Sequence, residues 1–152
     1  MFQNASKSIS LDEIEQIESE LNVKMPQSLK QHYIEFNGGT PDQRCWLQGD
    51  GYERLCIHRF LPMKYPAGEL TIESVYKRGI EKDFLSPDLL PFAIDEGSNF
   101  FCVDSDGVVY FYAMDSWSAK RTNNENKAKA RRQLVSSFEM FLAGLVDEPE
   151  EV

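Results

Sequence analysis

Cys56 and His58 are the residues whose types and spacing come closest to nucleophilic catalysis. A cysteine nucleophile needs a base beside its thiolate, and residues two apart in a β-strand point to the same face. No residue at a fitting spacing would orient the histidine, and a cysteine and a histidine on one strand face are usually packing or surface residues. We therefore predict no catalytic residues and expect that the chain is not an enzyme.

Two other groups of side chains contain the atoms of a metal site but lack its spacing. The segment Asp104-Ser105-Asp106-Gly107 resembles part of a calcium loop, but placing Gly107 at the loop glycine puts Cys102 and Ala113 at the first and last ligand positions. The second group has zinc-ligand types without closely spaced pairs: His32, Cys45, Cys56 and His58. We predict neither a metal nor a cofactor.

The charge of the chain is strongly negative, with 16 basic and 25 acidic residues and a formal net charge of −9. Such a surface repels nucleic acids and anionic membranes and attracts basic proteins. One basic cluster runs against this trend: Lys120, Arg121, Lys127, Lys129, Arg131 and Arg132. It is either a phosphate-binding or nucleic-acid-binding segment or a solvated loop that offsets the acidic remainder, and we favour the solvated loop.

Acidic residues at the ends of predicted turns offer a candidate binding site. Five of them could line one rim of a sheet, although each also fits a structural role in its turn: Asp95, Glu96, Asp104, Asp106 and Asp115. Large aromatic side chains often supply the centre of a protein interface. Combining the two features, the predicted partner-binding residues are Trp46, Tyr52, Asp95, Glu96, Asp115 and Trp117.

The length of 152 residues and the 41% hydrophobic content fit one globular domain spanning residues 1–152. Residues 1–9 and the acidic residues 147–152 are expected to be mobile. No apolar run reaches the roughly 18 residues that span a bilayer, and no export signal is visible. The three cysteines are odd in number and scattered, which predicts three free thiols, no disulfide and a reducing, cytoplasmic location.

Helical patterns occur near both ends of the chain. Ser10 and Glu13 form a capping box that opens a first helix, and a second begins at Pro26 and ends at Asn37-Gly38-Gly39. A short helix is predicted from Thr71 to about Arg78, with Gly79 as its stop, and a last one over Phe138–Leu145. Nine side chains are expected to be mostly inaccessible: Leu11, Ile14, Ile17, Leu21, Phe36, Phe101, Val103, Phe138 and Leu142.

Strand patterns fill the middle of the chain. Arg44–Gln48 and Arg54–Phe60 flank Gly49-Asp50-Gly51 as in a hairpin. Three further strands, predicted as an antiparallel meander, are Phe92–Asp95, Phe100–Asp104 and Val108–Met114. Residues 116–130 are polar and predicted to be a long mobile loop. The predicted fold class is α+β, an antiparallel-dominated β-sheet wrapped by two N-terminal helices and one C-terminal helix.

Three phrases of this sequence resemble the SUKH superfamily, which contains the fungal Smi/Knr cell-wall-synthesis regulators and many bacterial immunity proteins. The first runs from Leu11 through Leu21-Asn22-Val23-Lys24-Met25-Pro26 to Phe36-Asn37-Gly38-Gly39. The second runs from Leu90-Pro91-Phe92-Ala93 to Asp106-Gly107-Val108-Val109-Tyr110, and the third is Ser136-Ser137-Phe138-Glu139-Met140-Phe141-Leu142. The order and spacing of the three phrases carry the resemblance, and residues 116–130 depart from it by being longer and more basic.

The resemblance implies a non-catalytic domain that binds another protein. It implies most directly an immunity protein that neutralises a bacterial toxin by binding it, and the alternative is a regulatory or scaffolding protein in cell-wall (glucan) synthesis. The negative charge predicts a basic toxin domain as the partner. The class of that toxin and the oligomeric state do not follow from the sequence.

Overall fold

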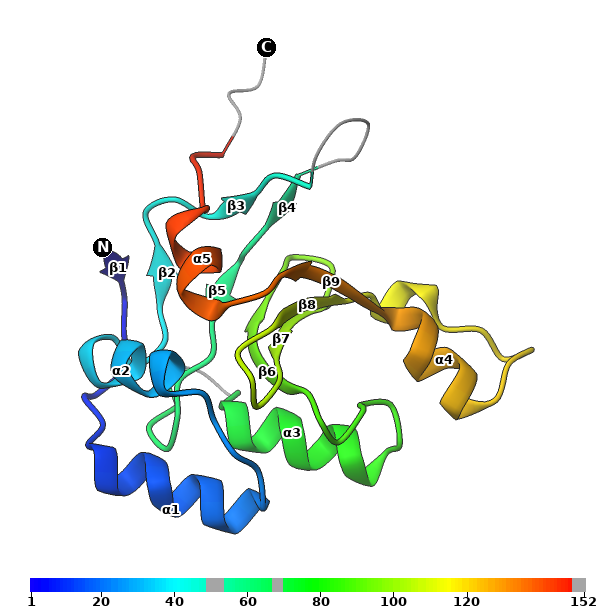
Figure 1. The fold of residues 1–152 in the computed structure, drawn as a ribbon, viewed down its shortest axis with the longest axis horizontal. Coiled ribbons are helices and arrows are strands. Elements are labelled where there is room, and N and C mark those ends of the chain that lie inside the picture. The colour runs from blue at the N-terminus through cyan, green and yellow to red at the C-terminus, as the bar shows by residue number, and fades with distance from the viewer. Residues whose placement is uncertain (49–53, 67–69, 149–152) are drawn as a thin grey trace.

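The computed structural model describes residues 1–48, 54–66 and 70–148, and Figure 1 shows its fold. The helices are α1 (Leu11–Leu21), α2 (Gln27–Glu35), α3 (Ile72–Glu81), α4 (Asn123–Ala130) and α5 (Phe138–Ala143), with the 3-10 helix η1 (Met114–Ser116). The strands are β1 (Phe2–Gln3), β2 (Thr40–Pro41), β3 (Cys45–Trp46), β4 (Leu55–Cys56), β5 (Arg59–Phe60), β6 (Leu90–Ile94), β7 (Phe100–Val103), β8 (Val109–Tyr112) and β9 (Arg131–Val135).

The centre of the fold is a five-stranded antiparallel sheet in the order β5-β6-β7-β8-β9. Each strand pairs with its neighbour along the chain, with Phe101 opposite both Ala93 and Phe111. Two-stranded ladders β1-β2 and β3-β4 complete the β-structure. The predicted meander and the predicted α+β class are therefore confirmed. The predicted strand Arg54–Phe60 is split into β4 and β5, which belong to different sheets, and the predicted turn at residues 49–51 lies outside the described residues.

Helices pack against both faces of this sheet (Figure 1). On one face, Phe92 contacts the rings of Phe138 and Phe141 on α5 at centroid distances of 5.2 and 5.7 Å. The hydroxyl of Tyr33 on α2 donates to the Phe92 carbonyl at 3.2 Å. On the other face, Tyr112 donates to the carbonyl of Phe84, in the link after α3, at 2.7 Å. The core therefore lies between these helices and the sheet.

The predicted capping box opens α1, because the Ser10 hydroxyl accepts from the Glu13 amide at 3.2 Å while the Glu13 carboxylate accepts from the Ser10 amide at 3.1 Å. Ile9 and Ile14 are both buried at the two positions of a hydrophobic staple. Leu11 stands in the exposed first turn and is 41% accessible, so its predicted burial is wrong. Ile9 takes the place in the core that the prediction gave to Leu11.

Most of the other burial predictions are confirmed. Six of the nine side chains are buried: Ile14, Ile17, Leu21, Phe101, Val103 and Phe138. Phe36 and Leu142 are only half-buried, because both line an open hollow between α2 and α5. The helix α3 also continues past its predicted stop to Glu81. Gly79 lies inside the helix and lets Leu85 pack so closely that a Cβ on residue 79 would lie 2.6 Å from the Leu85 Cβ.

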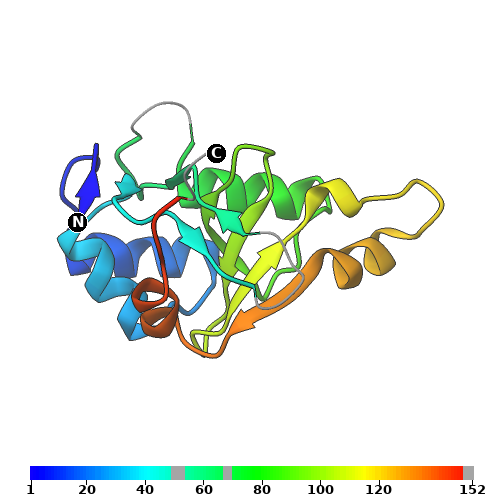
Figure 2. The same ribbon diagram turned by 90° about the horizontal axis from the view of Figure 1, so that it is seen from above.

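Two predictions about the remaining segments are wrong. Cys45 and Cys56 stand opposite each other on β3 and β4 and form a disulfide, which leaves Cys102 as the free thiol. The number of cysteines does not predict this bond, because it depends on the strand register that places Cys45 opposite Cys56. Residues 116–130 do not form one long loop but include α4, and the segment projects beyond the sheet in Figure 2.

Candidate functional site

One group of the predicted binding residues meets at the end of the sheet where β6 turns into β7. The Asp95 carboxylate accepts from the amides of Gly97 and Asn99 at 2.9 and 2.8 Å and from the Asn99 side chain at 3.1 Å. The Asn99 side-chain oxygen accepts in turn from the Asp115 amide, at 3.3 Å. Asn99 is buried and thereby joins the β6–β7 turn to η1.

We call this group the sheet-end cluster: Asp95, Glu96, Asn99, Asp115 and Trp117. Glu96 and Asp115 are exposed, and within the described part of the chain neither carboxylate has a hydrogen-bond or ion-pair partner. Trp117 caps η1 and lies half-buried against the core. The cluster thus offers two free carboxylates, and Asp115 lies in η1, which Trp117 caps, while Asp95 is occupied in building the turn.

Trp46 does not belong to this cluster. It lies on β3, which Figure 1 shows apart from η1, and its ring stacks on Phe141 of α5 at a centroid distance of 5.3 Å. Gly144 makes this packing possible, since a Cβ there would lie 2.4 Å from the tryptophan ring. The remaining predicted binding residue, Tyr52, lies outside the described residues. That these six residues bind a partner stays a prediction.

Two of the acidic turn residues stand at the opposite end of the sheet. The Asp104 carboxylate accepts from the amides of Asp106 and Val108, both at 3.0 Å, and so builds the β7–β8 turn. Gly107 of this turn has a φ of +90° and faces Pro26 and the start of α5. The expected single rim of five carboxylates is therefore divided between two ends of the sheet.

The basic cluster is largely engaged within the chain. Arg131 makes a two-pronged salt bridge to Asp88 at 3.2 and 3.0 Å and lies over the Tyr110 ring, and Lys127 pairs with Asp83. Asn126, which is buried, accepts from the Ser118 amide and the Arg121 guanidinium at 2.9 and 3.0 Å. These contacts give the cluster a structural role in ordering residues 116–131.

Cys56 cannot act as a nucleophile in this structure, because its sulfur is bonded to that of Cys45. The same bond removes two thiolates from the set of zinc-ligand types. Cys102 is the remaining cysteine, and burial raises the pKa of its thiol far above the usual range. In the described residues, no three histidine, cysteine or carboxylate side chains are grouped as a metal would require.

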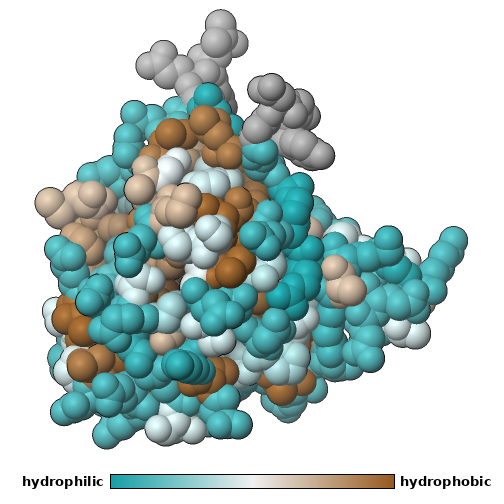
Figure 3. All heavy atoms as spheres, viewed as in Figure 1, coloured by the Kyte–Doolittle hydropathy of each residue, from teal (hydrophilic) through white to brown (hydrophobic). Residues whose placement is uncertain are grey.

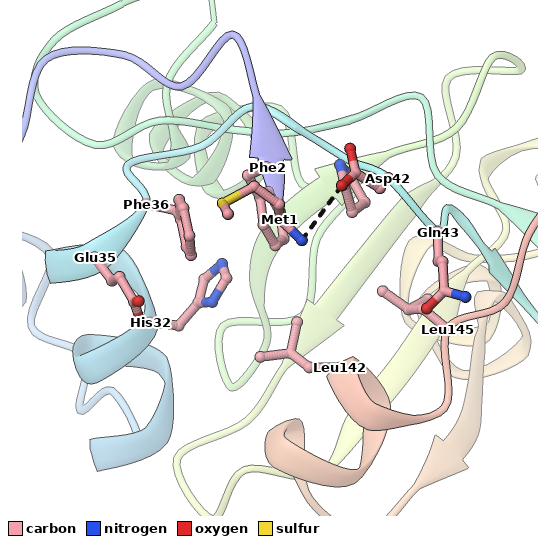
Figure 4. A pocket seen from close by; sticks show the side chains of 10 residues that line it. Met1, Phe2, His32, Glu35, Phe36, Asp42, Gln43, Leu142 and Leu145 are labelled. Atoms are coloured by element: carbon pink, nitrogen blue, oxygen red, sulfur yellow. Dashed lines mark ion pairs between the residues drawn. The ribbon is translucent and has the colours of Figure 1, made fainter.

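A second surface feature lies between α2, the β1–β2 ladder and α5. It is a hollow of about 490 Å³, shown in Figure 4. Its walls are Met1, Phe2, His32, Glu35, Phe36, Pro41, Asp42, Gln43, Leu142 and Leu145. Figure 3 shows hydrophobic residues gathered over α5 and the adjoining strands, and Met140 on α5 and Leu47 after β3 are 56% and 51% exposed. No local sequence pattern predicts this hollow, since its walls come from four separate segments.

His32 forms part of the wall of the hollow. Its ring packs against Phe2 at 4.7 Å and against Phe60 and Phe138 at 5.6 and 5.7 Å. Burial lowers the pKa of His32 to about 4, because the charged imidazolium is poorly solvated there. Its Nε2 atom is buried and has no hydrogen-bond partner among the described residues. At neutral pH the imidazole ring of His32 is therefore uncharged, and it adds no charge to the wall of the hollow.

Comparison with known proteins decides the family. The model of the SMI1/KNR4 family (SUKH-1) matches residues 8–144, which include all five helices and every strand from β2 onward. The chain belongs to the SMI1/KNR4 family. The SUKH resemblance of its three sequence phrases is thereby confirmed.

Other comparisons add little to this SUKH-1 assignment. A crystal structure of a protein from Pseudomonas syringae pv. tomato is similar over 78% of this chain and 74% of that one, with 19% identity and a TM-score of 0.48. No curated protein matches the sequence significantly. None of the helices in the described residues is long and apolar enough to cross a membrane.

Proposed function

We propose that this SUKH-1 chain is a non-catalytic immunity protein that neutralises a basic toxin by binding it. Membership of the family is consistent with such a role. The observation that carries the proposal is the sheet-end cluster, where Glu96 and Asp115 expose free carboxylates and Trp117 caps the short helix of Asp115, on a chain of net charge −9. Interfaces of this kind combine a charged rim with an aromatic anchor.

The geometry of the cluster suits fast and specific capture. Asp95 and Asn99 fix the β6–β7 turn by hydrogen bonds, so Glu96 is presented on a backbone that need not be ordered on binding. The net negative charge raises the encounter rate with a basic partner, and this effect is screened by salt. Burial of Trp117 under the partner would then slow dissociation.

The test needs a candidate partner, and the gene beside this one supplies it if it encodes a secreted protein with a toxin-like C-terminal domain. A cell-wall operon in that place would favour the rival role in glucan synthesis. Binding of the purified toxin domain is measured at low and high salt, and protection is measured in cells that express it. No binding and no protection would contradict the proposal.

Variants then locate the interface. Glu96→Lys and Asp115→Lys should mainly reduce the association rate and its salt dependence. Trp117→Ala should mainly raise the dissociation rate, and if Trp117 is a hot spot the loss of binding free energy is about 2 kcal/mol or more. Glu20→Lys on α1 is the matched control, because it changes the net charge equally at an exposed site far along the chain. Protection with both rates unchanged in all three variants would show that the interface lies elsewhere.

A further inference from the structure

The hollow between α2, the β1–β2 ladder and α5 has the composition of a binding pocket with two kinds of wall. Phe2, Phe36, Leu142 and Leu145 make it apolar on the inside. Figure 4 shows His32 and Phe36 of α2 on one side of the hollow, with α5 on the other side and Phe2 of β1 between them. An elongated side chain with an apolar stem would bury that stem between the two sides.

The polar part of the wall is acidic. Glu35 and Asp42 both line the hollow, while no lysine or arginine occurs among the described residues that line it. Glu35 is exposed and has no partner in the described part of the chain. Asp42 meets the amino group of Met1 at 3.6 Å and accepts a hydrogen bond from the side-chain amide of Gln3 at 3.2 Å. Both contacts are exposed, and such contacts contribute little.

Apart from the amino group of Met1, which pairs with Asp42, no described wall residue compensates this charge, so Glu35 is the carboxylate that is left for a partner. His32 is neutral above its pKa of about 4 and therefore adds no positive charge at physiological pH. Gln43 is uncharged and can accept a hydrogen bond from a donor in the hollow. A partner group that enters the hollow would thus meet aliphatic and aromatic carbon on the inside and carboxylates at the rim.

We infer that this hollow receives an arginine side chain from the toxin that the chain is proposed to bind. The inference rests on the proposed function and adds a second contact area to it. Arginine fits better than lysine because its planar guanidinium stacks on rings such as Phe2 and Phe36 and forms forked hydrogen bonds with carboxylates such as Glu35. The hollow is larger than one side chain, so the arginine would enter on a protruding loop.

The test is a double-mutant cycle with the purified toxin domain. The variant Glu35→Gln removes the free carboxylate without changing its size, and Glu20→Gln on α1 is the matched control. Each is combined with alanine variants of the exposed arginines and lysines of the toxin domain. We expect Glu35→Gln to speed dissociation at least tenfold, with one arginine of the toxin accounting for that loss in the cycle, and Glu20→Gln to change it less than twofold.

Other outcomes overturn the inference in separate ways. If the wild-type chain binds the toxin but no residue of it couples to Glu35, the hollow is not the contact. If a lysine couples instead, the assignment to arginine is wrong. If the wild-type chain does not bind the toxin at all, the proposed function fails and this inference falls with it. Circular dichroism of each variant confirms that it remains folded.

Discussion

The sheet-end cluster and the hollow beside α5 both present carboxylates, but they use them differently. At the sheet end, Asp95 accepts three hydrogen bonds from its own turn and has little left to offer a partner. In the hollow, Glu35 has no partner among the described residues and stands next to apolar carbon. The hydrogen bonds that a carboxylate already makes, rather than the number of acidic residues around it, therefore decide how much it can offer a partner. By this measure Glu96 and Asp115 at the sheet end resemble Glu35 and differ from Asp95.

The two regions also differ in what stabilises them. The sheet end is a hydrogen-bonded turn at the surface, whereas α5 is held by Phe141, whose ring stacks on Trp46 and meets Phe92 edge to face. Buried aromatic contacts contribute more to stability than exposed turn bonds do. Substitutions beside α5 should therefore cost stability, while substitutions of exposed sheet-end carboxylates should leave it almost unchanged.

The largest effect is expected for Phe141→Ala. This ring is fully buried, stacks on Trp46 and touches Phe92 and Phe101, so its removal leaves a cavity under α5. The free energy of unfolding should fall by about 3–5 kcal/mol. Urea denaturation measures it, with Phe100→Ala at a half-buried position as the control for loss of a ring. An equal loss of unfolding free energy in the two variants would contradict the larger contribution that is expected from packing of α5.

The second prediction concerns acid stability and His32. Its pKa is about 4 in the folded chain and about 6.5 when unfolded, so between these values the unfolded chain binds more protons. The free energy of unfolding is therefore at its full value above pH 6.5. It decreases as the pH falls towards 4, by at most about 3 kcal/mol. The measurement is urea unfolding of wild type and His32→Phe from pH 4 to 7. A stability difference that stays constant over this range would refute the prediction.

The third prediction concerns the disulfide that ties the Trp46 hairpin together. Thiol titration of the unfolded, unreduced chain should find one thiol, Cys102, and reduction should raise the count to three. Closing a loop with a sequence separation of 11 residues should stabilise the fold by about 2–3 kcal/mol. Denaturation with and without reductant tests the energy, with Cys45→Ser/Cys56→Ser as the control that reductant should not affect. Three thiols before reduction would show that the bond is not formed.

The smallest effects belong to the sheet end. Asp95→Ala removes the acceptor of three hydrogen bonds and should lower the free energy of unfolding by about 1–2 kcal/mol, whereas Asp95→Asn keeps one oxygen acceptor and should cost less. Glu96→Ala, next to it and exposed, should change stability by less than about 0.5 kcal/mol. Thermal unfolding compares the three variants. A larger loss for Glu96→Ala than for Asp95→Ala would reverse the assignment of the two carboxylates.

Local signals in the sequence predicted much of this fold. The capping box at Ser10, the apolar spacing through Ile14 and Ile17, and the aromatic meander each act over a few residues, and each is present in the structure. The helix α4 was missed although Thr122 and Glu125 form a capping box, because residues 123–130 lack an apolar stripe. Propensity and composition outweighed the cap in that prediction.

The candidate sites were harder to predict because they depend on contacts between distant segments. The separation of Trp46 from Asp95 follows from the packing of β3 on α5, which joins residues about a hundred positions apart. The disulfide depends on the register of β3 with β4, and the hollow on the meeting of Phe2, His32 and Leu142. None of these pairings between distant segments produces a periodic pattern in the sequence.

The side chain of Asn126 gives the projecting segment around α4 the character of a single cooperative unit. Apart from Ala130, it is the buried residue of that helix, and its amide group also donates to the Ser118 carbonyl at 2.9 Å. Loss of these bonds would release the loop and the helix together, since neither has much apolar area of its own to bury. In hydrogen exchange the amides of Ser118, Arg121 and Asn126 would then exchange at one common rate, and this rate would be faster than that of the amides in the sheet. The segment would open as a whole while the meander behind it stays folded.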